Sequence, residues 1–229
     1  MEQFIRGAAV SVPENLYLKD PLSSNLGKRI VRHGIELISE IGVDQFTFRK
    51  LGERIGSNES SLYRYFENKH KFLIYLCSWY WGWLEYRLVL AVHNLQDPEE
   101  RLYRALQVLT RPVEVDHAFA HIDEVQLHQI VVNEHTKPFL TQEVDRQNKA
   151  GYFEVYKRLI RRFAGVIRSV NPEYPFANSL ASTVLEGSLH HFFLEQHFPT
   201  LTDTDTKGDH TEFFRHLVCS GLEIKPSVA

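Results

Sequence analysis

Side chains that can hold a phosphate backbone and read base edges are concentrated between residues 47 and 69. Four hydroxyl groups can donate hydrogen bonds to phosphate oxygens: those of Thr47, Ser60, Ser61 and Tyr63. Lys69 adds a positive charge, and Arg49 and Arg64 are long enough to reach bases, where a bidentate contact to guanine discriminates by roughly 1 to 3 kcal/mol. These residue types in one short segment predict a surface for double-stranded DNA.

Glu59 is the acidic member of this group. A carboxylate suits the positive end of a helix dipole but repels phosphates. It can also accept a hydrogen bond from the amino group of cytosine. Glu59 therefore either reads a cytosine or lies back from the DNA backbone, and we assign it to base reading.

Three short helices are expected to position these side chains. Apolar residues recur at three- and four-residue steps from Ile30 to Ile41, and Gly42 signals the end of that first helix. Thr47 is expected to cap the second helix and Asn58 the third, with Gly56 in the turn between them. Two short helices joined by such a turn predict a helix-turn-helix.

The segment TFRKLGERIGSNESSLYRYFENKHKFL resembles the DNA-binding region of the tetracycline-repressor (TetR) family of bacterial transcription regulators. It has that family's order of second helix, glycine turn, recognition helix with Leu-Tyr-x-x-Phe, and a lysine opening the next helix. The resemblance implies an all-α fold with an N-terminal three-helix head and a larger helical domain for ligand binding and dimerisation. It also implies DNA contacts from Thr47, Arg49, Glu59, Ser60, Ser61, Tyr63, Arg64 and Tyr65, with Lys69 on a phosphate.

Two glycines depart from the family pattern. Gly34 and Gly52 stand where the family usually has alanine, in the packed faces of the first two helices. Each glycine costs about 1 kcal/mol of helix stability relative to alanine. This predicts a head that depends on docking to the larger domain.

The charge distribution supports a chain in three parts. We expect a weakly ordered extension over residues 1–24, the DNA-binding domain over 25–70, and the ligand-binding and dimerisation domain over 71–229. Residues 28–71 carry nine basic side chains against six acidic ones, whereas the residues after 71 carry fifteen against twenty. The positive field therefore lies on the head.

The chain is expected to be cytoplasmic and to make no membrane contact. No apolar run approaches the roughly 18 residues of a membrane span, and the N-terminus lacks a secretory signal. Cys77 and Cys219 are interpreted as reduced thiols, with a redox-sensing pair as the alternative.

An aromatic helix is expected from His70 to His93, followed by a helix that begins at Asp97-Pro98. Core packing explains its apolar stripe, but Trp79, Trp83 and Tyr86 could also line a small-molecule pocket. In the resembling family this helix links the head to the ligand domain. A ligand on its second half would therefore tilt the head.

Histidines are concentrated in the next segment, at His117, His121, His128 and His135. On one continuous helix they would share a face with Glu124, although a break is expected near Asp123. Three interpretations are a solvated or interface face, a polar pocket wall that includes His128, and a metal site. Seven-residue steps separate side chains by roughly 10 Å along a helix, so no metal or cofactor is expected.

One long amphipathic helix is expected from Val144 to Val170. Tyr152 and Tyr156 face inward and complete the set of pocket aromatics. The outward side is basic, with Lys157, Arg158, Arg161, Arg162 and Arg168. This face is either solvated or meets an acidic ligand or partner.

The last two helices, expected over residues 176–197 and 210–224, mix small and apolar side chains in a way that suits a homodimer. The expected contact residues are Leu180, Val184, Gly187, Ser188, His191, Phe213 and Leu217. Packing within the core of one chain is the alternative for part of this stripe. Two heads related by a two-fold axis read successive major grooves about 34 to 36 Å apart, so the operator should be an inverted repeat.

Sequence motifs of enzymes are missing: no glycine-rich phosphate loop, nucleophile elbow, paired-cysteine site or His-Glu-x-x-His is present. No catalytic residue is therefore assigned. The expected function is a TetR-like repressor, released from its operator by a small, largely apolar effector. The alternatives are a DNA-binding architectural protein without an inducer and a helical interaction protein.

Overall fold

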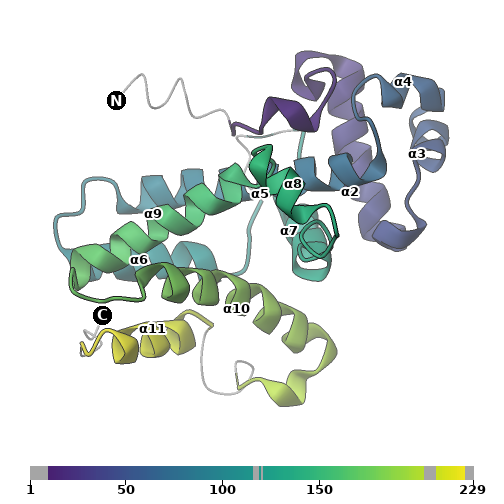
Figure 1. The fold of residues 1–229 in the computed structure, drawn as a ribbon. Coiled ribbons are helices and arrows are strands. Elements are labelled where there is room, and N and C mark those ends of the chain that lie inside the picture. Colours follow the sequence, from purple (N-terminus) through teal and green to yellow (C-terminus); the bar gives the residue numbers. More distant parts are fainter. Residues whose placement is uncertain (1–9, 116–118, 120, 204–209, 225–229) are drawn as a thin grey trace. The chain divides into compact units, whose positions relative to one another are not determined.

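The computed structural model describes residues 10–115, 119, 121–203 and 210–224 and is all-helical over them, which confirms the expected fold class (Figure 1). The chain divides into two compact units. The first comprises residues 1–82 and 113–155, and the second comprises residues 83–112 and 156–229. Helices α5 and α9 contribute to both units, because a unit boundary falls within each of them.

The first unit holds the N-terminal helices and two later ones. Its elements are η1 (Glu14–Leu16), η2 (Pro21–Ser23), α2 (Asn25–Gln45), α3 (Phe48–Ile55), α4 (Glu59–Tyr63), the first part of α5 (Lys69–Val92), α7 (Glu124–Glu134) and α8 (Val144–Lys149). Helix α2 packs against η2, α3 and α7, and α3 packs against α4.

Aromatic rings form the core beneath the helix-turn-helix. Phe72 at the start of α5 is fully buried and stacks on Phe46 with ring centroids 5.5 Å apart. Its edge contacts to Phe66 and Phe48 have centroid distances of 4.9 and 6.0 Å. Since all four rings are buried, Phe72 has little freedom to move.

Gly34 is required by this aromatic core. A Cβ atom at Gly34 would lie 2.8 Å from Cε1 of Phe72 and closer still to its Cζ. Packing therefore explains why glycine stands here despite its low helix propensity, because the methyl group of alanine would not fit beneath the Phe72 ring. Gly165 in α9 is the opposite case, because a Cβ there would meet nothing within 4 Å.

Gly34→Ala should lower the free energy of unfolding by about 1 to 2 kcal/mol, because overpacking outweighs the roughly 1 kcal/mol gained in helix propensity. Gly165→Ala should instead raise it by about 0.5 to 1 kcal/mol. Urea unfolding of both variants measures whether the free energy of unfolding falls or rises. Stabilisation by Gly34→Ala would contradict the packing described for Phe72.

Residues 144–170 form two helices and not the single expected one. Helix α8 ends at Lys149 and α9 (Glu154–Val170) begins five residues later. Between them Gly151 has φ +85°, a left-handed conformation that glycine adopts without strain. Tyr152 consequently lies in the turn, where the ammonium of Lys71 sits 5.5 Å from its ring centroid.

Residues 10–24 also differ from the expected weakly ordered extension. They include η1 and η2, and Leu16 is completely buried. Pro21 approaches α2 so closely that a Cβ at Gly27 would collide with its backbone. The apolar burial of Leu16 and Pro21 explains why this segment is ordered.

The second unit contains the last part of α5, α6 (Pro98–Thr110), most of α9, α10 (Ala177–His197), η3 (Pro199–Leu201) and α11 (His210–Gly221). Asp97 caps α6 as expected, because its carboxylate accepts from the amide of Glu99. Helix α10 packs against both α6 and α11. The described residues contain no helix long and apolar enough to cross a bilayer.

Candidate nucleic-acid interface

The helix-turn-helix forms as the sequence predicts. The Thr47 hydroxyl accepts from the amide of Lys50 at 3.2 Å, and the Asn58 side chain accepts from the amide of Ser61 at 2.8 Å. Gly56 between them is left-handed, with φ +62°. Both predicted caps are confirmed, and each contributes about 1 kcal/mol to helix stability.

Gly52 makes the turn tight. The amide of Ser57 donates to the carbonyl of Gly52 at 2.9 Å, so the chain folds back over α3. A Cβ at Gly52 would lie 2.8 Å from the carbonyl oxygen of Ser57. Because backbone atoms cannot move aside as a side chain can, this glycine sets the spacing of α3 and α4.

Most of the predicted DNA-contacting side chains share the exposed side of this motif. Thr47, Arg49, Ser60, Tyr63 and Arg64 are exposed, while Glu59, Ser61 and Lys69 are half-buried. Among the described residues the Arg64 guanidinium has no hydrogen-bond or ion-pair partner. It is therefore available to a base or a phosphate.

Tyr63 is held in place by its neighbours. Its ring packs edge-on against buried Phe48 with centroids 5.1 Å apart, and its hydroxyl donates to the Glu59 carboxylate at 3.3 Å. Ser60 and Ser61 both donate to the Asn58 side chain, at 3.0 and 2.7 Å. The polar face of α4 is thus partly ordered by contacts within the helix.

Arg49 is oriented by an ion pair that DNA can displace. Its Nε lies 3.1 Å from a carboxylate oxygen of Glu53, and the two side chains are 79% and 64% exposed. Exposed pairs of this kind contribute at most about 1 kcal/mol. The pair limits the rotamers of Arg49 without preventing a contact to DNA.

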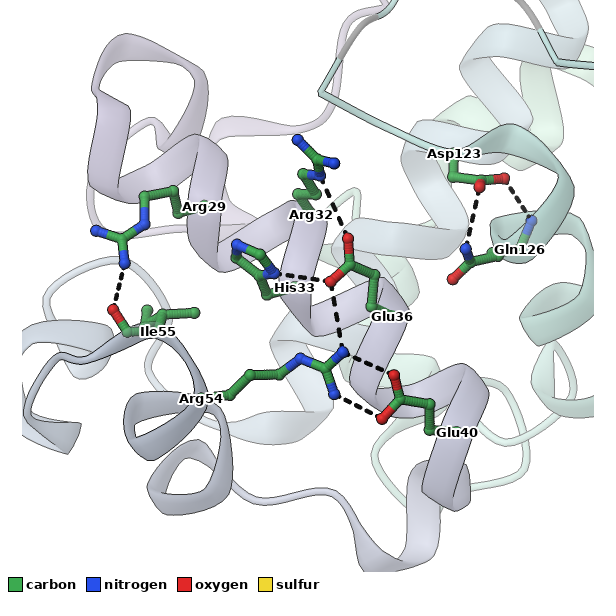
Figure 2. A network of polar contacts seen from close by, with 9 residues as sticks. All are labelled: Arg29, Arg32, His33, Glu36, Glu40, Arg54, Ile55, Asp123 and Gln126. Atoms are coloured by element: carbon green, nitrogen blue, oxygen red, sulfur yellow. Dashed lines mark hydrogen bonds and ion pairs between the residues drawn. The ribbon is translucent and has the colours of Figure 1, made fainter.

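Arg54, by contrast, fastens α3 to α2. Its guanidinium contacts Glu40 at 2.6 and 2.7 Å and lies 3.6 Å from Glu36 (Figure 2). Glu36 also contacts His33 at 2.7 Å and Arg32 at 3.3 Å. Burial raises the pKa of the Glu36 carboxyl, but the hydrogen bonds and charges of His33 and Arg32 outweigh it and hold this pKa below its ordinary value.

Two further contacts in Figure 2 fix helix ends. Arg29 of α2 donates to the backbone carbonyl of Ile55, at the end of α3. Asp123 caps α7, accepting from the amide and the side chain of Gln126 at 2.9 and 3.0 Å. The Asp123 cap confirms the predicted break, so His121 and His128 do not share one helix.

Tyr65 and Lys69, which the family resemblance implies as DNA contacts, both make hydrogen bonds within the protein. Tyr65 is only 4% exposed, and its hydroxyl lies 2.8 Å from the Ser24 hydroxyl, so its ring points inward. Lys69 donates to the carbonyl of Val43 at 3.0 Å and lies 3.4 Å from that of Asp44. Tyr65 is thereby removed from the exposed face, and Lys69 caps the end of α2.

In the first unit, α5 and α7 share a buried polar pair that the sequence did not reveal. The hydroxyl of Tyr80 lies 2.8 Å from Nδ1 of His128. Burial lowers the pKa of His128 to about 4, so the imidazole is neutral at physiological pH. Trp79 is also buried and packs edge-on against Phe119 with centroids 5.4 Å apart.

The other histidines are separated. His135 is buried at the end of α7, where its Nδ1 lies 2.8 Å from the carbonyl of Val131. His117 lies outside the described residues. Within the described part of the chain, no group of three or more His, Cys, Asp or Glu side chains could hold a metal ion. Cys77 and Cys219 are both buried free thiols.

In the second unit, the basic face of α9 meets a buried carboxylate. Glu85 is 6% exposed and accepts from Arg158 at 2.8 and 3.0 Å and from Arg162 at 2.9 Å. Burial raises the pKa of Glu85, but the hydrogen bonds and charges of the two arginines outweigh it and lower that pKa overall. Arg158 and Arg162 therefore meet an acidic group of this chain.

The remaining predicted pocket residues lie in the second unit. Trp83 is fully buried with the guanidinium of Arg87 5.0 Å from its ring centroid, and Tyr86 is half-buried. Tyr156 donates to the Glu186 carboxylate at 2.5 Å. Both units thus place aromatic side chains beside buried or half-buried polar groups.

The predicted dimer residues fall into two groups within the second unit. Val184 and Ser188 are fully buried, and Ser188 donates to the carbonyl of Leu109 at 3.1 Å, so both pack within the protomer. Phe213 and Leu217 of α11 are 46% and 39% exposed. Leu180, Gly187 and His191 are half-buried on α10.

The segment that contains the helix-turn-helix is similar in sequence to known proteins. Residues 30–76 match the family described as bacterial regulatory proteins, tetR family. A 44-residue stretch is 43% identical to the tetracycline repressor protein class A from transposon 1721 of Escherichia coli. That match spans 19% of this chain and 20% of the repressor.

Solved structures share the fold over most of the chain. A regulatory protein of the tetR family from Rhodococcus RHA1 has a TM-score of 0.60 at 14% identity, covering 90% of this chain and all of that one. AibR, solved with isovaleryl coenzyme A and operator DNA, has a TM-score of 0.56 at 15% identity, covering 88% and 100%. The helix-turn-helix segment of this chain is therefore similar to that of the tetR family of bacterial regulatory proteins, over about a fifth of the length of the curated relatives it matches.

Proposed function

We propose that this protein is a transcriptional repressor in the cytoplasm, which binds an inverted-repeat operator as a homodimer and leaves it when a small, largely apolar molecule binds. The observation that carries the proposal is the exposed face of α3 and α4, where Arg49, Tyr63 and Arg64 stand on helices fixed by two side-chain caps. Arginines on such a face can read guanine in the major groove.

The candidate effector contacts are Trp79, His128 and Tyr152 in the first unit and, taken separately, Trp83, Tyr86 and Tyr156 in the second. The neutral hydrogen-bonding pair of Tyr80 and His128 is buried among aromatic residues of α5, which suits an apolar ligand with one polar group. AibR, which shares the fold, was solved with an acyl coenzyme A and operator DNA together. That precedent supports a regulator that responds to a small molecule.

The proposed homodimer uses the exposed side of α10 and α11. Phe213 and Leu217 are large apolar side chains open to solvent, and the ring of His191 on α10 lies 5.0 Å from the Phe213 ring, centroid to centroid. A Cβ built at Gly187 would lie 3.2 Å from the Phe214 ring, so the small residue lets α10 and α11 approach closely beside this face. Apolar groups on a face with small residues favour close approach of a second copy.

Selection of bound duplexes from random DNA by the full-length protein tests the proposal. We expect an inverted repeat whose half-sites lie about 10 bp apart centre to centre or a near multiple. Sedimentation at micromolar concentration should give a dimer, and addition of the effector should release the selected duplex.

Recovery of no preferred sequence would contradict operator binding. A monomer in sedimentation would contradict the homodimer, and operator affinity unchanged by every bound small molecule would contradict the inducer.

A further inference from the structure

Residues 10–24, here called the N-terminal strap, run along the first unit before the helix-turn-helix begins (dark purple in Figure 1). The strap is anchored in the core by Leu16, which is fully buried, while its neighbour Leu18 is 64% exposed. Asp20 caps η2 through the amide of Leu22 at 2.8 Å. The strap is therefore a folded element with its own core contact.

One end of the strap contacts Tyr65, which lies two residues beyond the recognition helix α4. The amide of Leu18 donates to the carbonyl of Tyr65 at 2.7 Å, and the Ser24 hydroxyl lies 2.8 Å from the Tyr65 hydroxyl. The ammonium of Lys19 lies 5.2 Å from the Tyr65 ring centroid. Leu18, Lys19 and Ser24 of the strap thus all contact Tyr65, through its backbone carbonyl, its ring and its hydroxyl.

Ser24 connects two helices at this point. Its hydroxyl accepts from the amide of Gly27 at 3.1 Å and so caps α2, while it also contacts Tyr65. Tyr65 lies only two residues beyond α4 and directly after Arg64. The start of α2 and the end of α4 are therefore joined through a pair of hydroxyl groups.

The other end of the strap lies on α5 and on the turn between α8 and α9. The Asn15 side chain donates to the carbonyl of Ala150 at 2.5 Å, next to left-handed Gly151. Tyr17 packs edge-on against Tyr75 of α5 with centroids 6.1 Å apart. Farther along α5, a Cβ at Gly82 would lie 2.8 Å from a methyl of Val10.

We propose that the N-terminal strap positions the recognition helix for base reading, with Tyr65 as its attachment point and not as a DNA contact. Helix α4 has only five residues, so its own hydrogen bonds cannot fix its orientation. The Asn58 cap holds its first turn, and the strap holds its end. This assignment rests on the proposed function of the α3–α4 face.

Base and phosphate contacts differ in how much misplacement they tolerate. A bidentate contact from Arg64 to a base needs defined geometry, whereas attraction of basic side chains to the phosphates depends mainly on charge. Loosening the strap changes no charge on the head. It should therefore reduce the preference for the operator while sparing the binding of unrelated DNA.

The test compares two leucines of the strap in the full chain. Leu16→Ala removes the buried anchor, and Leu18→Ala is the matched control, because it trims an exposed side chain and keeps the amide that reaches Tyr65. The readouts are amide hydrogen exchange across residues 59–66 and the ratio of affinities for the selected operator and a scrambled duplex.

Leu16→Ala should speed exchange across residues 59–66 and reduce the affinity ratio about tenfold, with binding to the scrambled duplex within about twofold of wild type. Leu18→Ala should change neither quantity. An unchanged ratio and unchanged exchange in Leu16→Ala would overturn the proposal, as would an equal loss for both duplexes.

A second variant keeps the test decisive if Leu16→Ala unfolds. Tyr65→Phe removes only the hydroxyl contact to Ser24 and should lower the same ratio by about threefold, because one of the three strap contacts to Tyr65 is lost. An unchanged ratio in Tyr65→Phe would then overturn the proposal. If the wild type prefers no duplex, operator binding fails, whereas hydrogen exchange still reports on the strap.

Discussion

Replacing Arg49 and Arg64 together by alanine should weaken operator binding about a hundredfold or more, because each arginine can contribute roughly 1 to 3 kcal/mol of base discrimination. Arg64 has no partner among the described side chains, and Arg49 has only an exposed ion pair to Glu53. Their removal should therefore leave the fold intact. Thermal unfolding should differ little from wild type, while operator affinity falls.

The matched control is Arg104→Ala with Arg111→Ala, which removes the same charge from exposed positions in the second unit. This control should keep operator affinity within about threefold, because its charges lie outside the helix-turn-helix. The salt dependence adds a second distinction. Loss of phosphate contacts alone would lower the salt slope and weaken all duplexes alike, whereas loss of base contacts spares the scrambled duplex.

A second large effect is expected from acid. Burial lowers the pKa of His128 to about 4, whereas an unfolded histidine titrates near 6.5. Between these values the unfolded chain binds more protons, so stability rises with pH. The contribution is fully present above about pH 6.5 and is lost as the pH falls to about 4, which amounts to roughly 3 kcal/mol.

His128→Gln isolates this effect, because the amide keeps a polar partner for the Tyr80 hydroxyl and cannot be protonated in this range. Urea unfolding at pH 7 and at pH 4.5 should show a smaller loss of stability for His128→Gln than for wild type. His216→Gln replaces an exposed imidazole and should behave as wild type. Equal pH dependence in all three proteins would contradict the buried neutral state of His128.

The helix-turn-helix was predictable because its signals are local. Thr47 and Asn58 accept from amides three residues ahead of them, and Gly56 supplies a left-handed turn at the place where the apolar spacing stops. Such contacts depend on neighbours within one turn of helix, so a short stretch of sequence contains them. The helix starts at Asp97 and Asp123 could be predicted for the same reason.

The features that the sequence missed depend on contacts between distant residues. Leu18 and Ser24 contact Tyr65, which lies more than forty positions away in the sequence. The hydroxyl of Tyr80 in α5 contacts His128 in α7. The resemblance to the family carried Tyr65 over as a DNA contact, because an aromatic residue beside Arg64 gives no sign of which side faces inward. The burial of the Tyr65 ring in the structure shows that this side chain faces inward.

The split between α8 and α9 was missed for a different reason. Apolar spacing continues across Gly151, and a single glycine inside a helical pattern does not by itself indicate a break. Likewise the arginines of α9 have a spacing typical of a solvated face, and the buried Glu85 that pairs with two of them belongs to another helix. Periodicity shows which residues share a face but not what covers it.

The glycines of the head show how packing overrides intrinsic propensity. Gly34 and Gly52 looked unfavourable in helices, yet Phe72 and the Ser57 carbonyl occupy the space that a methyl group would need. The approach of Phe72 to Gly34 sets α5 against α2, and the approach of the Ser57 carbonyl to Gly52 sets the spacing of α3 and α4. The proposed reading of DNA depends on that geometry, since it places the exposed arginines.

The most direct test of DNA reading by the α3–α4 face is the ratio of wild-type affinities for the selected operator and a scrambled duplex of equal length at near-physiological salt. The account predicts a ratio of about a thousand or more, and a much smaller ratio for the Arg49 and Arg64 double variant. A wild-type ratio near one, with steep salt dependence on both duplexes, would show binding to the phosphate backbone alone and would contradict sequence reading by this face.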